Sequence, residues 1–228
     1  MRYMSLAAGA MIAMSLTTSA SAERPVTEGA KVGEWTMDFD AAKALAKAKN
    51  LPLLLNFTGS DWCGWCKLMD KNVFSTEAWK SYATQNMVTV FIDFPKDKSL
   101  VPAKVVERNK TLSEKFEVGG YPTYILLAAD GEKQLGKLSA SRDATPANFI
   151  QSIKKQTEWP AKIAKLSPEN KAIYDKAKTG QEAVEKEMNT WVETKPERNE
   201  ANTKKFEGFM ERMKTFEKDI ADLMEKQK

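Results

Sequence analysis

Short apolar runs separated by polar, turn-forming segments occupy the middle of the chain. The runs 53–57 and 87–93 are almost continuously apolar, which is typical of strands buried on both faces of a sheet. A third strand is predicted from Thr123 to Ala128, and the pair Asp130-Gly131 predicts a hairpin into a fourth strand from Gln134 to Leu138. The pattern therefore indicates a sheet built from these strands.

Helix-forming residues lie between the strands. Asp40 is expected to cap a helix over 41–49, which Asn50 and Pro52 end. A second helix is predicted from Cys63 to about Ser75, and 79–82 either continues it or follows it. A third is predicted around 112–116, after an insertion over 95–110. The last runs from Pro146 to about Glu158, with Thr145 as its cap. This order predicts an α/β fold, with a central mixed β-sheet flanked by helices.

The composition changes beyond Trp159-Pro160, where charged residues dominate and no strand is predicted. We expect a domain over 23–159 and an α-helical C-terminal extension over 160–228, whose helices Gly180 and Pro196 interrupt. An apolar stripe with spacings of three and four comprises Phe206, Phe209, Met213, Phe216, Ile220 and Leu223. Packing on the first domain, or on the preceding helix through Ile173, Val184, Met188 and Trp191, is favoured. The alternative is a dimer or a partner complex formed through the C-terminal helix.

The first residues resemble an export signal. Arg2 gives a positive start, 6–16 is a short apolar run, and Ala20-Ser21-Ala22 has the small-x-small pattern of a cleavage site. We predict a signal peptide over 1–22, removed after Ala22, because the apolar run is too short to span a bilayer comfortably as an uncleaved anchor. A periplasmic or secreted protein is therefore expected.

Composition excludes several functions. The 228 residues are 42% hydrophobic and 29% charged, as in ordinary soluble proteins, and lysines and glutamates are interspersed, so the net charge of +4 does not predict nucleic-acid binding. Histidine is absent and only two cysteines are present. A histidine-activated nucleophile, the usual tetrahedral zinc site and covalent haem attachment are therefore excluded, and we expect neither a metal nor a cofactor.

The two cysteines form the motif Cys63-Gly64-Trp65-Cys66, placed between a buried strand and a helix. The unpaired backbone N–H groups and the dipole at a helix start favour a thiolate on Cys63. Cys66 lies one turn further on, where its sulfur can attack a mixed disulfide formed on Cys63. An inert structural bridge is the alternative, although closing so short a loop stabilises a fold little.

Three segments resemble the thioredoxin superfamily, in particular secreted bacterial thioredoxin-like proteins with a Cys-Gly-Trp-Cys active site. They are the run from Trp62 through the two cysteines to Lys67, the run Gly120-Tyr121-Pro122-Thr123, and Asp130-Gly131; the likeness extends over about 34–158. The resemblance implies a thioredoxin-like fold and catalytic roles for Cys63 and Cys66. It also implies a cis-proline at Pro122 facing the cysteines, and substrate pairing with the backbone of Tyr121.

Two departures from the family pattern affect the chemistry. Asn56 stands where thioredoxins have a buried acid that assists the second cysteine, and either Asp61 or Asp93 is a candidate to replace it. Trp65 occupies a position where proline or histidine is common, which disfavours a strongly oxidising protein. Trp65 is expected to form an exposed wall of a substrate surface. For Trp62, the same role and packing in the core are both predicted.

These observations favour a thiol-disulfide oxidoreductase that reduces or isomerises disulfides of exported proteins. No nicotinamide or flavin motif is present, so electrons are expected from a partner, a membrane-bound thiol reductase. Two alternatives remain open. One is a non-catalytic binding or chaperone-like module with a structural disulfide, and the other is a dithiol oxidase.

Overall fold

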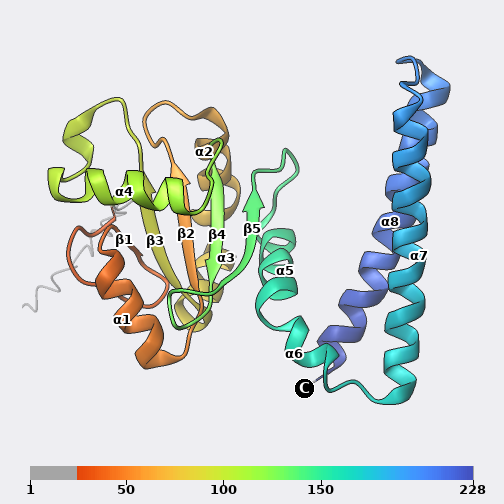
Figure 1. The fold of residues 1–228 in the computed structure, drawn as a ribbon, viewed down its shortest axis with the longest axis horizontal. Helices are drawn as coiled ribbons and strands as arrows, with labels where there is room; N and C mark the ends of the chain where they lie inside the picture. The colour runs from red at the N-terminus through yellow and green to blue at the C-terminus, as the bar shows by residue number, and fades with distance from the viewer. Residues whose placement is uncertain (1–24, 228) are drawn as a thin grey trace, which may run out of the picture.

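A computed structural model describes residues 25–227. The predicted signal peptide over 1–22 lies outside the described residues. Five strands form one mixed sheet in the order β1-β3-β2-β4-β5 (Figure 1). Their bounds are Trp35–Thr36 (β1), Leu53–Thr58 (β2), Val88–Asp93 (β3), Thr123–Leu127 (β4) and Gln134–Ser139 (β5). Strands β1, β3 and β2 are parallel, whereas β4 is antiparallel to β2 and β5 to β4.

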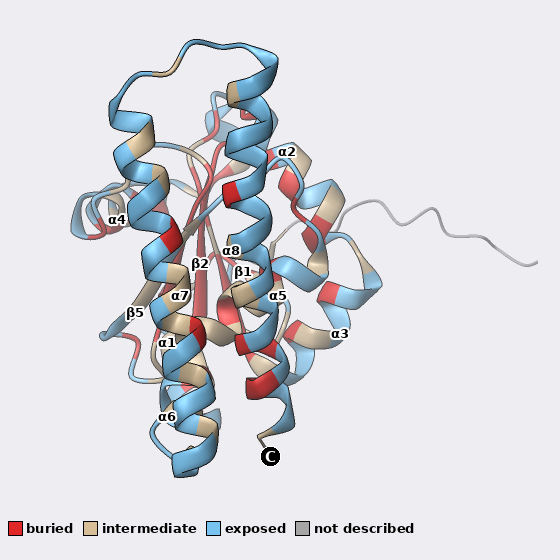
Figure 2. Cartoon of the chain, turned by 90° about the vertical axis from the view of Figure 1, so that its right-hand side faces the viewer, coloured by how far each residue is buried: buried red, intermediate tan, exposed pale blue. Residues whose placement is uncertain are grey.

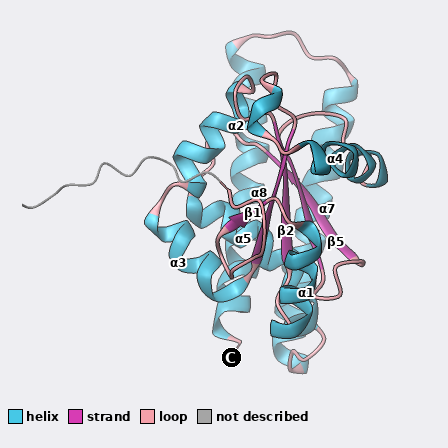
Figure 3. Cartoon of the chain, turned by 90° about the vertical axis from the view of Figure 1, so that its left-hand side faces the viewer, coloured by secondary structure: helices cyan, strands magenta, loops and turns pink. Residues whose placement is uncertain are grey.

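Helices cover both faces of this sheet, as Figure 3 shows. All six residues of β2 are buried, in agreement with the apolar run that predicted it. On one face, Leu55 and Phe57 pack against α1 (Phe39–Lys49) and α4 (Ala103–Lys115). On the other face, Leu54 packs in a cluster with residues of α3 (Glu77–Asn86) and α5 (Pro146–Thr157). The predicted α/β fold is confirmed.

Strand β1 is an element that the hydrophobic pattern missed. It has two residues, Trp35 and Thr36, which pair with Thr89 and Val90 of β3. A segment this short carries no period-two pattern, so only its pairing with β3 identifies it as a strand.

Two predicted element boundaries are wrong. Asp38, not Asp40, caps α1, because the Asp38 carboxylate accepts the N–H of Ala41 at 3.0 Å. The helix predicted around 112–116, after an insertion over 95–110, instead begins at Ala103, directly after Pro102. Its apolar positions are sparse, but Val105, Asn109 and Leu112 fall on one buried face at helical spacing.

The C-terminal helices form an antiparallel hairpin beside the sheet domain (Figures 1 and 2). After α6 (Trp159–Ile163), α7 (Pro168–Glu193) and α8 (Glu200–Lys226) run side by side. Gly180 does not interrupt α7, which was expected to break there. A Cβ at Gly180 would lie 2.5 Å from the ring of Phe216, so glycine lets α8 approach closely.

The apolar stripe of α8 packs mainly within this hairpin. Phe209 contacts Trp191 of α7 with ring centroids 5.7 Å apart, and Ile220 and Leu223 are buried in a cluster with Trp159. Ile173, expected in this contact, is instead 48% exposed. Packing on the preceding helix is thus confirmed in part, and a dimer through α8 stays a prediction.

Within residues 25–227, none of the helices combines the length and the apolar character needed to cross a membrane.

Candidate active site

The two cysteines lie where the loop after β2 enters a helix. The backbone N–H groups of Trp62 and Cys63 both donate to the carbonyl oxygen of Gly59, which turns the loop back on itself. Cys63 then takes the N-cap position of α2 (Gly64–Met69), which continues as a π-helical turn over Asp70–Phe74. The predicted helix from Cys63 to about Ser75 is therefore confirmed, and α3 follows it as a separate helix capped by Thr76.

Cys63 and Cys66 form a disulfide, with Cα atoms 5.2 Å apart. The backbone N–H of Cys66 donates to the sulfur of Cys63 at 3.1 Å. This N–H is one of the unpaired donors of the first helical turn, so it would stabilise a negative charge on the Cys63 sulfur after reduction. Cys63 is 5% and Cys66 is 7% exposed, so both residues are largely buried.

Trp62 joins three loops around the disulfide. Its indole Nε1 donates to the carbonyl oxygen of Phe94 at 2.8 Å, and its ring meets the Tyr121 ring edge-on at 5.7 Å. A Cβ at Gly59 would lie 2.4 Å from the indole, so only glycine allows this ring to lie on the loop. Trp62 is nevertheless 42% exposed. The side chain therefore supports the loop without being buried in the core, and its role in a substrate surface stays a prediction.

Trp65 extends the same surface. It is 45% exposed, as predicted, and its role as one wall of a substrate surface stays a prediction. Lys67 also points away from the core, and its Nζ donates to the carbonyl oxygen of Asp61 at 2.7 Å. The disulfide is thus bordered by two exposed indoles and a lysine.

The expected cis-proline is present. The Tyr121–Pro122 peptide bond is cis, and Pro122 is buried at the start of β4. The Tyr121 ring contacts both Trp62 and Phe94, which places the 120–122 turn beside the loop that carries Cys63. The structure therefore brings together Trp62, Cys63, Cys66, Tyr121 and Pro122, the residues that the resemblance associates.

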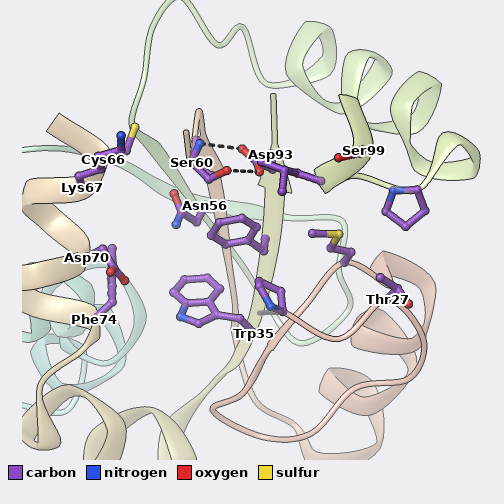
Figure 4. Close-up of a pocket in the computed structure, with 16 residues that line it drawn as sticks. Thr27, Trp35, Asn56, Ser60, Cys66, Lys67, Asp70, Phe74, Asp93 and Ser99 are labelled. Atoms are coloured by element: carbon purple, nitrogen blue, oxygen red, sulfur yellow. Dashed lines mark hydrogen bonds between the residues drawn. The ribbon is translucent and has the colours of Figure 1, made fainter. Parts of the chain in front are cut away.

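A cavity of about 600 Å³ lies against Cys66 (Figure 4). Asn56 and Asp93 line it from the neighbouring strands β2 and β3. The Asp93 carboxylate accepts the backbone N–H of Ser60 at 2.9 Å and its hydroxyl at 2.6 Å. Burial raises the pKa of Asp93, because it disfavours the charged carboxylate more than the Ser60 hydrogen bonds favour it.

Asp61 has a different role. Its carboxylate accepts the backbone N–H groups of Lys96 and Asp97 at 3.0 and 2.9 Å, and these bonds lower the pKa of Asp61, the bond from Asp97 most. Asp61 thereby tethers the active-site loop to the segment after β3. Of the two acids left open by the sequence, Asp93 is the one that shares a cavity with Cys66.

Sequence reasoning missed Ser60 and Phe94, which position Asp93 and Trp62. Phe94 accepts the Trp62 hydrogen bond through its backbone carbonyl, and the type of residue in a sequence does not indicate a contact made by the backbone. Ser60 lies in a turn sequence, and its partner Asp93 is 33 residues away, so only the parallel register of β2 and β3 brings them together. Across the described chain, no three His, Cys, Asp or Glu side chains converge in a way that could hold a metal ion.

Comparisons with known proteins agree with this geometry. The disulfide bond reductase DsbH of Chlamydia pneumoniae is 34% identical over 99 residues, which cover 42% of this chain and 58% of DsbH. The thioredoxin-related protein DsbJ of the same organism is 26% identical over 153 residues, covering 67% of this chain and 42% of DsbJ. The chain thus spans about half the length of these curated relatives.

Solved structures with a similar fold include a DsbH oxidoreductase, with a TM-score of 0.49, 24% identity and coverage of 64% of this chain and 94% of that one. A thioredoxin from Thermus thermophilus has a TM-score of 0.41 and 23% identity, covering 53% and 84% of the two chains. A family model described as a thioredoxin-like domain matches residues 39–155, more than half of the chain and all of the sheet beyond β1. The chain therefore belongs to the thioredoxin-like family.

Proposed function

We propose that this protein is a thiol-disulfide oxidoreductase that reduces or isomerises disulfides in exported proteins. One observation carries the proposal: a Cys63–Cys66 disulfide with Cys63 at a helix N-cap, bordered by the exposed indoles of Trp62 and Trp65. The names of DsbH and DsbJ, a disulfide bond reductase and a thioredoxin-related protein, support the same chemistry.

The reaction starts from the reduced pair. The Cys63 thiolate attacks one sulfur of a substrate disulfide, forming a mixed disulfide and releasing the other substrate sulfur as a thiolate. Cys66, after losing its proton, then attacks the Cys63 sulfur and releases the second substrate thiolate. Two electrons have passed to the substrate, and the protein carries the Cys63–Cys66 disulfide. In isomerisation, a second substrate thiol resolves the mixed disulfide and no net electrons move.

Asp93 is the group proposed to accept the proton of Cys66. Both residues line the same cavity, and the raised pKa of Asp93 brings its basicity closer to that of a thiol than an ordinary aspartate. Asn56, at the family's usual acid position, has no ionisable group for this step.

Substrate binding is assigned to the surface made by Trp62, Trp65 and Tyr121, with Pro122 beneath it. Flat aromatic rings on both sides of a reactive sulfur suit extended or unfolded segments, which expose apolar side chains and backbone together. Tyr121 lies two residues before β4, and its backbone is proposed to pair with an extended substrate strand.

Regeneration requires a protein electron donor. We assign this role to a membrane-bound thiol reductase facing the periplasm, since the sequence holds no nicotinamide or flavin motif. The proposed export signal over 1–22 would bring the chain to that compartment.

Equilibration of the pair with reduced and oxidised glutathione tests the proposal. A reductase is expected to have a reduction potential below that of the glutathione couple, an isomerase a potential somewhat above it, and a dithiol oxidase a potential far above it. Iodoacetamide labelling at neutral pH after mild reduction separates the binding-module alternative. The enzyme should label quickly at Cys63 and slowly at Cys66, whereas equally slow labelling of both would indicate a structural disulfide.

A further inference from the structure

The cavity beside Cys66 is separate from the proposed substrate surface. Its walls come from the segment before β1, from β1 to β3, from the helix that follows Cys63 and from the segment after β3. Trp62, Trp65 and Tyr121 are not among its lining residues. Its volume of about 600 Å³ falls in the range of small-molecule sites, roughly 300 to 1,000 Å³.

One wall of the cavity is aromatic. Trp35 meets Phe74 edge-on at 5.3 Å and Phe91 at 6.1 Å, so three rings are held in fixed mutual orientation. Met37 and Leu100 add flexible apolar surface. Such a wall fits a flat apolar group, and the faces of its rings attract a nearby cation.

Asn56 supplies an unpaired hydrogen-bond acceptor beside the cavity. Asn56 is 6% exposed, and its side-chain oxygen has no hydrogen-bond partner, an arrangement that costs stability unless something donates to it. Figure 4 shows Asn56 between the carboxylates of Asp70 and Asp93. Because the amide can rotate, its oxygen can face a donor in the cavity.

The lining charges favour a cation. Asp70 and Asp93 contribute two carboxylates, whereas the single lining ammonium, on Lys67, donates outward to the carbonyl oxygen of Asp61. Asp93 is 4% exposed, and its carboxylate accepts hydrogen bonds from neutral donors, on Ser60 and on the backbone of Phe94. A protonated amine in the cavity would offset the burial that raises the pKa of Asp93.

We propose that the cavity bounded by Trp35, Asn56, Asp70 and Asp93 binds a small organic cation, with a planar apolar body against the aromatic wall and a protonated amine facing the two carboxylates. A bound ligand would also cover Cys66, because Cys66 lines the cavity and Cys63 does not. Occupancy would therefore restrict access of solvent to the resolving sulfur.

Tryptamine, which joins an indole to a primary amine, is the probe. Titration into the ¹⁵N-labelled protein with its disulfide intact should shift the backbone amides of Asn56 and Asp93 and the indole N–H of Trp35. The uncharged analogue indole and the anion indole-3-propionate should bind about tenfold more weakly, as expected when one charged hydrogen bond is lost. No thiol exchange occurs in this measurement, so its result is independent of the proposed enzymatic function.

Two variants locate the site. Asp70→Asn removes an exposed carboxylate at the edge of the cavity and should weaken tryptamine binding about fivefold to tenfold. Leu100→Trp fills the cavity and should abolish binding. The control Asp219→Asn removes an exposed carboxylate of α8 and should bind as the wild type does. Unchanged affinity in both cavity variants, no shifts at millimolar tryptamine, or shifts confined to Trp62 and Trp65 would each overturn the proposal.

Discussion

The indole Nε1 of Trp62 is hydrogen-bonded to the carbonyl oxygen of Phe94, so the residue before Cys63 is anchored to the segment that leaves β3. The Tyr121 ring contacts both of these residues. The loop that carries Cys63 is therefore positioned by side chains from three separate parts of the sequence.

Replacing Trp62 tests this anchor. Trp62→Phe keeps an aromatic ring but removes the N–H donor, and is expected to lower the free energy of unfolding by about 0.5 to 1 kcal/mol, measured by urea denaturation. In Trp62→Phe, the rate at which a protein disulfide is reduced should fall more than the rate of Cys63 alkylation. The substitution affects the positioning of the substrate more than the reactivity of the Cys63 thiolate. Trp65→Phe is the matched control and should leave stability unchanged. Equal stability of all three proteins would contradict the anchoring role.

The order of the two cysteines in the reaction can be read from trapped intermediates. Cys66→Ser should accumulate a mixed disulfide with a protein substrate that contains a disulfide, because no resolving sulfur remains. The mixed disulfide would be visible on a non-reducing gel. Cys63→Ser should show no such adduct and should reduce insulin no faster than dithiothreitol alone. An adduct formed mainly on Cys66 would reverse the assigned roles.

Asp93 should make stability fall with rising pH. Burial raises the pKa of Asp93 in the folded protein, so between the unfolded value near 3.8 and the raised folded value the unfolded chain binds fewer protons. The contribution of protonated Asp93 to the free energy of unfolding is therefore complete below the unfolded pKa. It is lost as the pH rises through the raised pKa of the folded protein. Asp93→Asn is expected to flatten this decline in urea denaturation series from pH 4 to 8.

The same variant has a kinetic consequence. If Asp93 accepts the proton of Cys66, Asp93→Asn should slow resolution of the mixed disulfide while leaving the alkylation rate of Cys63 unchanged. Asp61→Asn is the comparison, because Asp61 binds backbone N–H groups of Lys96 and Asp97 instead of lining the cavity. Resolution rates are measured by quenched flow with a fluorescent disulfide substrate, and an unaltered rate in Asp93→Asn would exclude the proton role.

Two glycines in the helical hairpin should respond in opposite ways to the same substitution. Gly208→Ala adds a methyl group with no atom within 4 Å, and should stabilise α8 by about 0.5 to 1 kcal/mol. Gly180→Ala places its methyl group against the Phe216 ring and should destabilise by about 1 kcal/mol despite the better helix propensity. Circular dichroism melting compares them, and equal stabilisation would show that the close approach of α7 and α8 is not required.

Local sequence signals predicted the parts of the fold whose causes are local. The apolar runs of β2 and β3, the Asp130-Gly131 hairpin and the Thr145 cap each depend on a few neighbouring residues. Gly180 was misjudged because its requirement comes from Phe216, a residue of another helix.

The candidate site divides in the same way. The positions of Cys63 and Cys66 follow from the strand, turn and helix around them, and Pro122 from the family resemblance. The cavity could not be predicted in this way, because its residues come from separate strands and from the segment before β1. The parallel pairing of β2 with β3 puts Asn56 and Asp93 on adjacent strands, with Asn56 opposite Phe91 and Asp93 opposite Thr58.

Trp159 has a practical consequence for any attempt to isolate the sheet domain. It is 7% exposed because residues of α7 and α8, among them Ala177, Ile220 and Met224, surround its ring. A truncated chain ending near residue 160 would keep the tryptophan and lose this cover. The Trp159 indole of the fragment would then be exposed to solvent as new apolar surface. Self-association of such a fragment would result from the truncation and would not be a property of the intact protein.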